Sequence, residues 1–311
     1  MSKILVIGDV MFDIHMQCNS SRLSPEAPVP VCLLDKSRKI LGGAANVAAQ
    51  IAQASACTLA YIYSKSDITK VDLEHVCALN YIDTLKLETK THYDIPQKTR
   101  IWSNGQQVCR LDKEEEFPAF SSETRLRWLK TIKDFIVDQG TKLIILSDYN
   151  KGIFDDDFLQ NIIDIANKMG VITILDPKRP TYSTLEGLSI TTPNNAEMEK
   201  TIMTPEEVSE RMVGTYLIHT RGAEGMDCYR NSRKLTHVFA HNVEVSDTCG
   251  CGDTVVSFLA LALQKVGYQL DQVTIKQAME AASYAASRTV THHGSYVLTK
   301  EETQAVFGFV R

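Results

Sequence analysis

The residues best suited to chemistry lie in the segment DTCGCGD at 247–253, directly before an apolar stretch at 254–265 that is typical of a helix. Glycines before a helix let backbone N–H groups converge on a ligand without obstruction by side chains, and the helix dipole adds partial positive charge there. Asp253 then has two interpretations: a first-turn residue that the dipole favours, or a carboxylate that accepts a hydroxyl proton during phosphoryl transfer. For developing negative charge we expect a concave site of backbone N–H groups at the start of this helix.

A second glycine-rich segment, GGAANVA at 42–48, also opens a helical pattern. Its paired glycines, Gly42 and Gly43, indicate either close packing of a helix on a sheet or close approach of the backbone to a ligand. In the second arrangement Asn46 can donate and accept hydrogen bonds with sugar hydroxyls. The segment alone leaves both interpretations open.

Two other motifs are weaker. The segment TPNNAE at 192–197 places Asn194 three residues before Glu197, a spacing more often found in a helix cap than in a site. Cys249 and Cys251 form a CxC pair with no second pair nearby, and because structural zinc sites normally have four ligands, packing of small residues is the better interpretation. Neither GxxxxGK[ST] nor GxGxxG occurs, which disfavours a P-loop enzyme and a standard dinucleotide-binding protein.

The elements that must position these residues follow from apolar runs that alternate with helical patterns. Strand-like runs lie at 3–10, 58–64, 142–148, 171–177, 188–194 and 215–221, and helical patterns at 43–54, 122–138, 155–169, 204–213, 253–265 and 272–287. Nearly continuous apolar strands are typical of a parallel sheet buried on both faces, so the alternation predicts a doubly wound α/β fold, mostly parallel and flanked by helices. Ligands bind at the carboxyl ends of such strands, where the pattern places Asp9, Asp148, Asp176, Asn194 and Thr220.

Two segments, 12–34 and 92–112, interrupt the alternation with candidate hairpins. In the second, Asn104 and Gly105 are the residues that a tight type I′ turn prefers. Four short strands outside the main sheet would make a small β subdomain. They are either a lid that excludes water from the site or edge hairpins without a moving part.

Composition and charge indicate a globular protein and exclude several classes of partner. The chain has 311 residues, of which 44% are hydrophobic and 23% charged, so it can bury a sizeable core. Its net charge is −5 without a basic block, which argues against nucleic acid or an anionic membrane as the main partner. The longest nearly apolar run, 255–263, is far shorter than the ~20 residues that cross a bilayer. The chain opens on a β-like run without a secretory signal, so we expect one cytoplasmic domain over 1–311 with reduced cysteines.

Taken in order, these motifs resemble the ribokinase-like family of sugar kinases, also called the phosphofructokinase-B family. Its hallmarks are an early GG-containing helix start and a late DTxGxGD anion hole that carries the catalytic aspartate. The chain is more similar to one branch, the kinases of D-glycero-D-manno-heptose 7-phosphate, which occur alone or as the first half of a bifunctional enzyme. The resemblance rests on GDVM (8–11) with Asp13, SPEAPVP (24–30), GGAANVA (42–48), QQ (106–107), RLD (110–112), LSDY (146–149), KG (151–152), DPK (176–178), TPN (192–194) with Glu197, TR (220–221) and GM (225–226).

The resemblance implies a role for each matching position. Asp253 would be the general base, while the amides of Gly250, Cys251 and Gly252 hold the transferring phosphoryl group. The sugar would be bound by Asp13, Gly42, Gly43, Asn46 and Asp148, and its phosphate by Arg110, Lys151 and Lys178, ahead of Lys98 and Arg100. The nucleotide would be bound by Asn194, Glu197, Thr220, Arg221, Gly222, Gly225 and Ser283, with Asn194 and Glu197 orienting Mg²⁺ through water.

The implied activity is ATP-dependent phosphorylation of the anomeric C1 hydroxyl of the heptose 7-phosphate, which supplies the 1,7-bisphosphate for ADP-heptose and the lipopolysaccharide core. The implied partners are ATP, the sugar phosphate, Mg²⁺ and a second copy of the chain bound through the β lid; a monovalent cation is a further candidate. Two alternatives stay open. One is another kinase of this fold acting on ribose, fructose 6-phosphate or a nucleoside. The other is a catalytically idle homologue that binds a sugar or nucleotide.

Overall fold

The computed structural model describes residues 3–65, 67, 69–114 and 119–309. A nine-stranded sheet forms its centre, and the strands from β11 to β5 run parallel to their neighbours, whereas β12 and β13 run antiparallel to theirs. In spatial order the strands are β13 (Arg233–Val238), β12 (Met226–Arg230), β11 (Tyr216–Thr220), β10 (Ile190–Thr191), β9 (Ile172–Asp176), β8 (Leu143–Ser147), β1 (Ile4–Gly8), β4 (Cys57–Ser64) and β5 (Asp83–Thr89). This arrangement confirms the predicted α/β fold.

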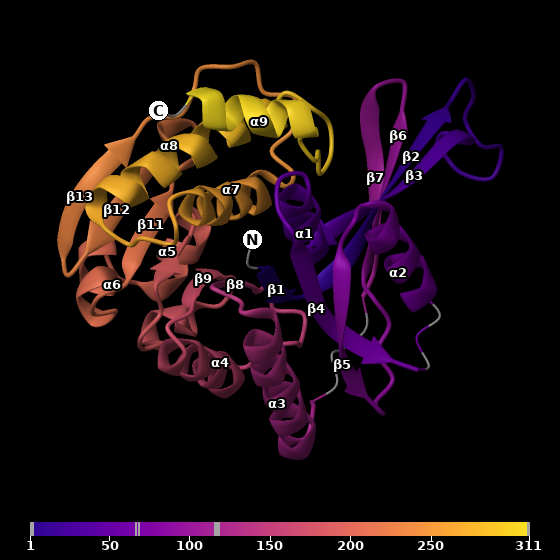
Figure 1. Ribbon diagram of the computed structural model, residues 1–311. Coiled ribbons are helices and arrows are strands. Elements are labelled where there is room, and N and C mark those ends of the chain that lie inside the picture. Colours follow the sequence, from indigo (N-terminus) through magenta and orange to yellow (C-terminus); the bar gives the residue numbers. More distant parts are fainter. Residues whose placement is uncertain (1–2, 66, 68, 115–118, 310–311) are drawn as a thin grey trace.

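Helices cover both faces of the sheet (Figure 1). Four of them, α1 (Ala44–Ala52), α7 (Cys251–Lys265), α8 (Gln272–Thr289) and α9 (Lys300–Phe309), lie over one face, while α3 (Ser122–Gln139) and α4 (Asp156–Lys168) lie over the other. The remaining helices are α2 (Lys70–Leu79), α5 (Asn195–Thr201) and α6 (Pro205–Arg211). Because it is covered on both sides, the middle of the sheet is buried at every residue of β1, β8 and β9. No helix of the described chain is long and apolar enough to cross a membrane.

A smaller four-stranded sheet projects from this body (Figure 1). We call it the lid sheet; in spatial order it contains β3 (Leu33–Gly43), β2 (Val10–Asn19), β6 (Gln97–Ser103) and β7 (Gln106–Lys113). The turn between β6 and β7 has positive φ at Asn104 (50°) and Gly105 (79°), as the type I′ prediction requires.

The first lid segment differs from the sequence expectation. It was expected to end at residue 34, but its second strand begins at Leu33 and continues to Gly43, so the glycine pair ends a strand and α1 begins at Ala44. Gly43 has φ +59°, and a Cβ there would lie 2.4 Å from the carbonyl oxygen of Asp9. The paired glycines therefore permit a close approach between the end of β3 and the end of β1.

The segment 294–298 ties the C-terminal part of the chain to α1. Gln50 in α1 donates to the carbonyl of Tyr296 (2.7 Å) and accepts from the amide of Leu298 (3.1 Å). The same side chain donates to the hydroxyl of Thr254 in α7 (3.1 Å). This buried glutamine therefore joins three parts of the chain beneath the site described next.

Candidate active site

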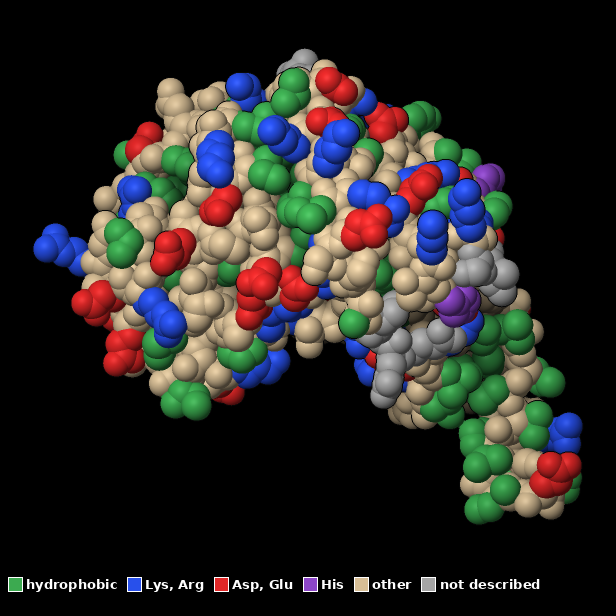
Figure 2. All heavy atoms as spheres, turned by 90° about the horizontal axis from the view of Figure 1, so that it is seen from below, with side chains coloured by type: hydrophobic (Ala, Val, Ile, Leu, Met, Phe, Trp, Pro, Cys, Tyr) green, Lys and Arg blue, Asp and Glu red, His purple; other side chains and the backbone are tan. Residues whose placement is uncertain are grey.

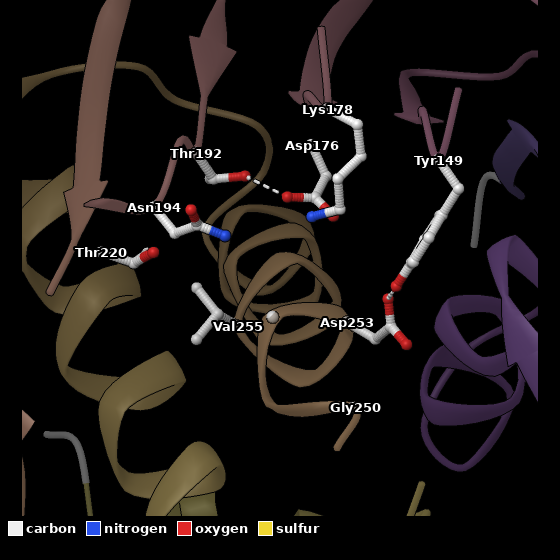
Figure 3. A pocket seen from close by; sticks show the side chains of 10 residues that line it. Tyr149, Asp176, Lys178, Thr192, Asn194, Thr220, Gly250, Asp253 and Val255 are labelled. Atoms are coloured by element: carbon white, nitrogen blue, oxygen red, sulfur yellow. Dashed lines mark hydrogen bonds between the residues drawn. The ribbon is translucent and has the colours of Figure 1, made fainter. Parts of the chain in front are cut away.

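A cavity of about 140 Å³ lies at the carboxyl ends of β8 to β11, where the N-terminus of α7 meets them. Figure 3 shows side chains from these elements pointing into it. Its lining residues are Tyr149, Asp176, Lys178, Thr192, Asn194, Thr220, Gly250, Gly252, Asp253 and Val255. The structure thus brings the DTCGCGD segment together with the ends of four strands.

Asp253 lies in the first turn of α7 and is only 3% exposed. Tyr149 donates its hydroxyl to Oδ1 (2.6 Å), and Asn46 donates its side-chain amide to Oδ2 (2.7 Å). Burial raises the pKa of Asp253 to about 6, while these two donors and the ammonium of Lys178 act to lower it and Asp13 to raise it. A carboxylate with such a pKa is ionised at neutral pH and can accept a proton.

The glycines at 250 and 252 shape the backbone beside this carboxylate. Gly250 has φ +73°, and a Cβ there would lie 3.0 Å from the Asn46 amide nitrogen. Gly252 lines the cavity, and a Cβ there would meet no described atom within 4 Å. The Cys251 amide donates to the Thr248 carbonyl (3.3 Å), closing the turn before the helix. This backbone leaves open space in front of the helix N-terminus, which suits a negatively charged group.

The thiols of this segment are not grouped with other ligand side chains in the described part of the chain. Cys249 and Cys251 are free, and among the described residues no three His, Cys, Asp or Glu side chains are placed to hold a metal. Burial raises the pKa of the Cys251 thiol to about 11, so it stays protonated and weakly nucleophilic.

A second acidic group lies on the other side of the cavity. Burial raises the pKa of Asp176 to about 7; Lys178 opposes this, and the carboxylates of Glu197 and Asp253 add to it. Lys178 forms an ion pair with Glu197, which is 3% exposed. Burial would lower the pKa of Lys178, but the carboxylates around it raise it overall. The lysine is therefore a charged ammonium at neutral pH.

The weak motif at 192–197 is a helix cap beside the cavity. The Asn194 side chain accepts from the Glu197 amide (3.0 Å), and the Asn194 amide donates to Glu197 Oε2 (2.8 Å), which completes a capping box at the start of α5. Its interpretation as a cap is confirmed.

The donor chemistry at this end of the cavity fits a hydrated magnesium ion. The carboxylates of Asp176, Glu197 and Asp253 all act on the ammonium of Lys178, which leaves a local excess of negative charge. Mg²⁺ prefers oxygen ligands, keeps several waters, and is commonly bound through one or two carboxylates plus substrate phosphates. Asn194 and Glu197 have such oxygens.

The lid sheet contributes Asp13 and Arg100. Asp13 is buried and accepts from Arg100 (2.6 Å) and from the hydroxyl of Ser295 (3.0 Å). A Cβ at Gly42 would lie 2.9 Å from Asp13 Oδ2, so the glycine makes room for this carboxylate. Arg100 also approaches Cys249, with 3.7 Å between a guanidinium nitrogen and Sγ. An arginine of the lid sheet therefore reaches the DTCGCGD segment.

The other predicted cations lie farther out. The Arg110 side chain is 51% exposed and forms two hydrogen bonds with Asp112 (2.9 and 3.0 Å). Lys151 forms an ion pair with Glu114 at 2.5 Å. Of the cations expected to reach a sugar phosphate, Lys178 lines the cavity, and Arg100 contacts Asp13.

Two buried aspartates hold the loops after β8 and β9. Asp9 accepts from the amides of Tyr149 (3.0 Å), Lys151 (2.9 Å) and Ile153 (3.1 Å). Asp148 is fully buried and accepts from Arg179 (2.7 and 3.2 Å). Asp148 was expected to bind substrate, but in the structure its carboxylate binds the guanidinium of Arg179, which lies after β9.

The residues expected around the nucleotide extend from the start of α5, through the end of β11, to α8. Of these, Asn194 and Thr220 line the cavity. Arg221 forms ion pairs with Glu224 and with Asp227 (3.0 Å), and Ser283 in α8 donates to the Phe239 carbonyl (3.0 Å).

The turn from β11 to β12 contains two further residues expected around the nucleotide, Gly222 and Gly225. Gly222 belongs to the 3₁₀ turn Gly222–Glu224. Gly225 has φ +92°, and a Cβ there would lie 2.1 Å from the Val238 carbonyl oxygen. Gly225 is therefore required by the packing of this turn against the end of β13.

Sequence reasoning missed three residues of the site: Tyr149, Arg179 and Ser295. Tyr149 follows the carboxyl end of β8, and that position in the LSDY segment was the available signal. Arg179 and Ser295 act through partners 31 and 282 residues away in the chain, and nothing in their local sequence indicates those contacts.

Comparisons with known proteins agree with this geometry. A model of the pfkB family of carbohydrate kinases matches residues 1–302. The protein named "Bifunctional protein HldE" is 34% identical over 315 residues in Helicobacter pylori (strain G27), covering 97% of this chain and 65% of the relative. The same-named protein of Pasteurella multocida (strain Pm70) is 33% identical over 318 residues, covering 99% and 64%. The chain therefore spans less than two thirds of the length of these relatives.

Solved structures share the fold. Phosphofructokinase-2 from Escherichia coli, in complex with potassium, superposes with a TM-score of 0.76 at 15% identity, covering 100% of this chain and 99% of that one. Ribokinase from Thermotoga maritima superposes with a TM-score of 0.69 at 19% identity, covering 99% of this chain and 100% of that one.

Proposed function

This chain belongs to the pfkB family of carbohydrate kinases, which are phosphotransferases with an alcohol acceptor, and from that premise we propose that it phosphorylates the anomeric C1 hydroxyl of D-glycero-D-manno-heptose 7-phosphate with ATP. The observation that carries the kinase chemistry is the buried Asp253 carboxylate beside the open backbone of Gly250 and Gly252. The heptose substrate is supported by the branch motifs and by 33–34% identity to the bifunctional HldE relatives.

In the proposed reaction, Asp253 takes the proton of the sugar hydroxyl while the oxygen of that hydroxyl bonds to the γ-phosphorus of ATP. The bond between that phosphorus and the bridging oxygen breaks, ADP leaves, and the proton passes from Asp253 to solvent. The amides of Gly250 and Gly252 and the ammonium of Lys178 stabilise the charge on the transferring group, whereas the Cys251 amide, also expected there, is bonded to the Thr248 carbonyl. Asn194 and Glu197 would hold Mg²⁺ through water, and the bound ion would supply charge neutralisation for the phosphates.

The remaining predicted residues take supporting roles in this proposal. Asp13, Gly42, Gly43 and Asn46 shape the sugar side, and Thr220, Arg221, Gly222, Gly225 and Ser283 the nucleotide side. The bisphosphate product would serve ADP-heptose and lipopolysaccharide core synthesis.

The direct test is turnover with a panel of acceptors. Purified protein with ATP and Mg²⁺ is offered the heptose 7-phosphate, fructose 6-phosphate, ribose and a nucleoside, and ADP is measured. We expect ADP with the heptose 7-phosphate and a new anomeric phosphate signal by ³¹P NMR. ADP with another acceptor alone would overturn the substrate, whereas ATP binding without ADP from any acceptor would indicate an idle homologue.

The role of Asp253 is tested by Asp253→Asn. This variant should bind ATP with unchanged affinity and lose a factor on the order of 10²–10⁴ in turnover, because the base is absent. The matched control is Asp138→Asn on the exposed side of α3, which should turn over like the unaltered protein. Unchanged turnover in Asp253→Asn would refute the assigned role.

A further inference from the structure

Tyr149 is a tyrosine whose hydroxyl meets the proposed base directly. It lies two residues after the end of β8, and its ring points toward α7 (Figure 3). Its hydroxyl is 2.6 Å from Asp253 Oδ1, and the Asn46 amide is 2.7 Å from Oδ2. Each oxygen of the carboxylate thus accepts one bond from the protein. A carboxylate has about four lone-pair positions, so capacity for a substrate hydroxyl is left.

The position of this tyrosine is fixed by contacts that need no ligand. Its backbone amide donates to Asp9 Oδ2 (3.0 Å), and the same carboxylate also accepts the amides of Lys151 and Ile153. The Lys178 ammonium lies 5.3 Å from the centre of its ring, within the range of a cation–π contact. The hydroxyl is therefore preorganised against Asp253.

The hydroxyl remains a donor throughout the neutral range. Burial raises the pKa of Tyr149 well above its usual value, and the carboxylates of Asp253 and Asp176 raise it further. The other charged or titratable groups that act on Asp253 come from several elements: Lys178 after β9, Asp176 at its end, Asp13 on β2 and Cys251 on α7. Apart from Lys178, Tyr149 and Asn46 are the groups that favour the charged carboxylate.

We propose that Tyr149 is a positioning residue for phosphoryl transfer: together with Asn46 it orients the Asp253 carboxylate and stabilises its ionised form until the acceptor hydroxyl gives up its proton. This inference rests on the base role proposed for Asp253. A hydrogen bond to an ionised acceptor is stronger than one to the neutral acid, so the contact favours the state that can accept a proton. It weakens once that proton has arrived, which helps to release the proton to solvent.

The test removes the hydroxyl and keeps the ring. In Tyr149→Phe the acidic limb of the kcat/KM profile should move to higher pH by about one unit, because a bond to the charged base has been lost. We also expect kcat to fall about tenfold or more while the KM for ATP stays within about twofold. The matched control is Tyr61→Phe on β4, where a buried tyrosine donates to Glu74 (2.9 Å), and its profile should match the unaltered protein.

A second variant strengthens the hydrogen-bond donor that Tyr149→Phe removes. Site-specific 3-fluorotyrosine at position 149 keeps the shape and makes the phenol a stronger donor, so the acidic limb should move to lower pH. If Tyr149 only fills space, neither replacement would move the limb, and that result would overturn the proposal. The fluorinated protein also provides the test if Tyr149→Phe does not fold.

A measurement without substrates separates this inference from the proposed function. The Asp253 carboxyl is titrated by ¹³C NMR in protein labelled on aspartate, with Asp253→Asn identifying its signal. Tyr149→Phe should raise the pKa of this carboxyl, and 3-fluorotyrosine should lower it. If Asp253→Asn keeps its turnover, the base role fails. If Asp253→Asn loses turnover but the titration is the same in all Tyr149 forms, only the role of Tyr149 fails.

Discussion

Asp9, Asp176 and Asp253 are buried carboxylates whose pKa values burial raises, to about 6, 7 and 6 respectively. Their surroundings give them different roles. Asp9 accepts three backbone amides and holds the loop after β8, whereas Asp176 and Asp253 line the cavity. Asp253 faces open space beside the glycine backbone. Asp253 and Asp176 can therefore exchange protons at the cavity near neutral pH, whereas the three amide donors make Asp9 an anchor for the loop.

The raised pKa of Asp253 has a consequence for stability. Between pH ~4 and ~6 the folded protein holds a proton that the unfolded chain has lost, so stability decreases as pH rises through this window. Asp253→Asn removes the buried charge and should increase the free energy of unfolding at pH 7.5 by up to about 3 kcal/mol, with little change at pH 4. Asn46 Oδ1 is buried and has no hydrogen-bond partner among the described residues, so it can accept from the new amide if the Asn46 side-chain amide rotates by about half a turn.

Urea unfolding at both pH values measures this effect. Asp138→Asn, exposed on α3, serves as the control and should change neither value. A loss of stability in Asp253→Asn at pH 7.5 would show that the ionised carboxylate is stabilised more by its hydrogen bonds than it is destabilised by burial.

At the scale of elements, the start of α7 decides whether a phosphoryl group can be accommodated. Gly252 is helical, and an added methyl would meet no described atom within 4 Å, yet the residue lines the cavity. Gly252→Ala should therefore fold with equal or slightly higher stability, since alanine favours a helix by about 0.5–1 kcal/mol over glycine. Its turnover should fall at least tenfold, because the methyl occupies space that the transferring group needs.

Thermal unfolding and ADP release measure the two effects separately. Gly308→Ala in α9, where an added methyl also meets no described atom, is the matched control for the helix effect and should keep full turnover. Full turnover in Gly252→Ala would mean that the phosphoryl group lies elsewhere.

The sequence predicted those strands that are buried on both faces of the sheet. β1, β8 and β9 are buried on both faces and read as continuous apolar runs. β5, with the sequence DTLKLET, lies at an edge of the sheet and is only partly buried, so it carried no such signal. The run expected at 188–194 yields only β10 (Ile190–Thr191), because the chain then meets Pro193, which has no N–H to donate.

The part of the site made by neighbouring residues could be predicted from the sequence. The contacts between residues far apart in the chain could not. The glycines near 250 and the acidic Asp253 follow from seven consecutive residues. The hydroxyl of Tyr149 reaches Asp253 across 104 residues, and the ion pair of Arg179 with Asp148 depends on two adjacent strand ends. Such contacts depend on the order of strands in the sheet, which apolar patterns do not give.

At the scale of the whole molecule, the lid sheet forms an arm with hydrophobic side chains on its surface (Figure 2). Exposed apolar residues on its strands are Leu33, Leu34, Val108 and Leu111, and Leu23 and Val29 are exposed in the segment between β2 and β3. An exposed sheet with such a surface favours association with another chain, and we propose that a second copy covers it.

Light scattering after size exclusion tests this association. The protein should elute as a dimer, and Leu34→Lys with Leu111→Lys should convert it to a monomer, since both side chains are more than half exposed on the arm (58% and 59%). Val273→Lys, which is 69% exposed on α8, is the matched control and should remain dimeric. A monomeric unaltered protein would refute the proposal.

The contacts around Asp13, Gln50 and Asp253 also constrain how the molecule can be made. Ser295 reaches Asp13, and the backbone of Tyr296 and Leu298 is held by Gln50, so residues 13 and 50 meet residues 295–298 beside one site. A growing polypeptide therefore lacks these contacts until residues 295–298 have emerged from the ribosomal exit tunnel, so the Asp13 carboxylate cannot take its final position before then.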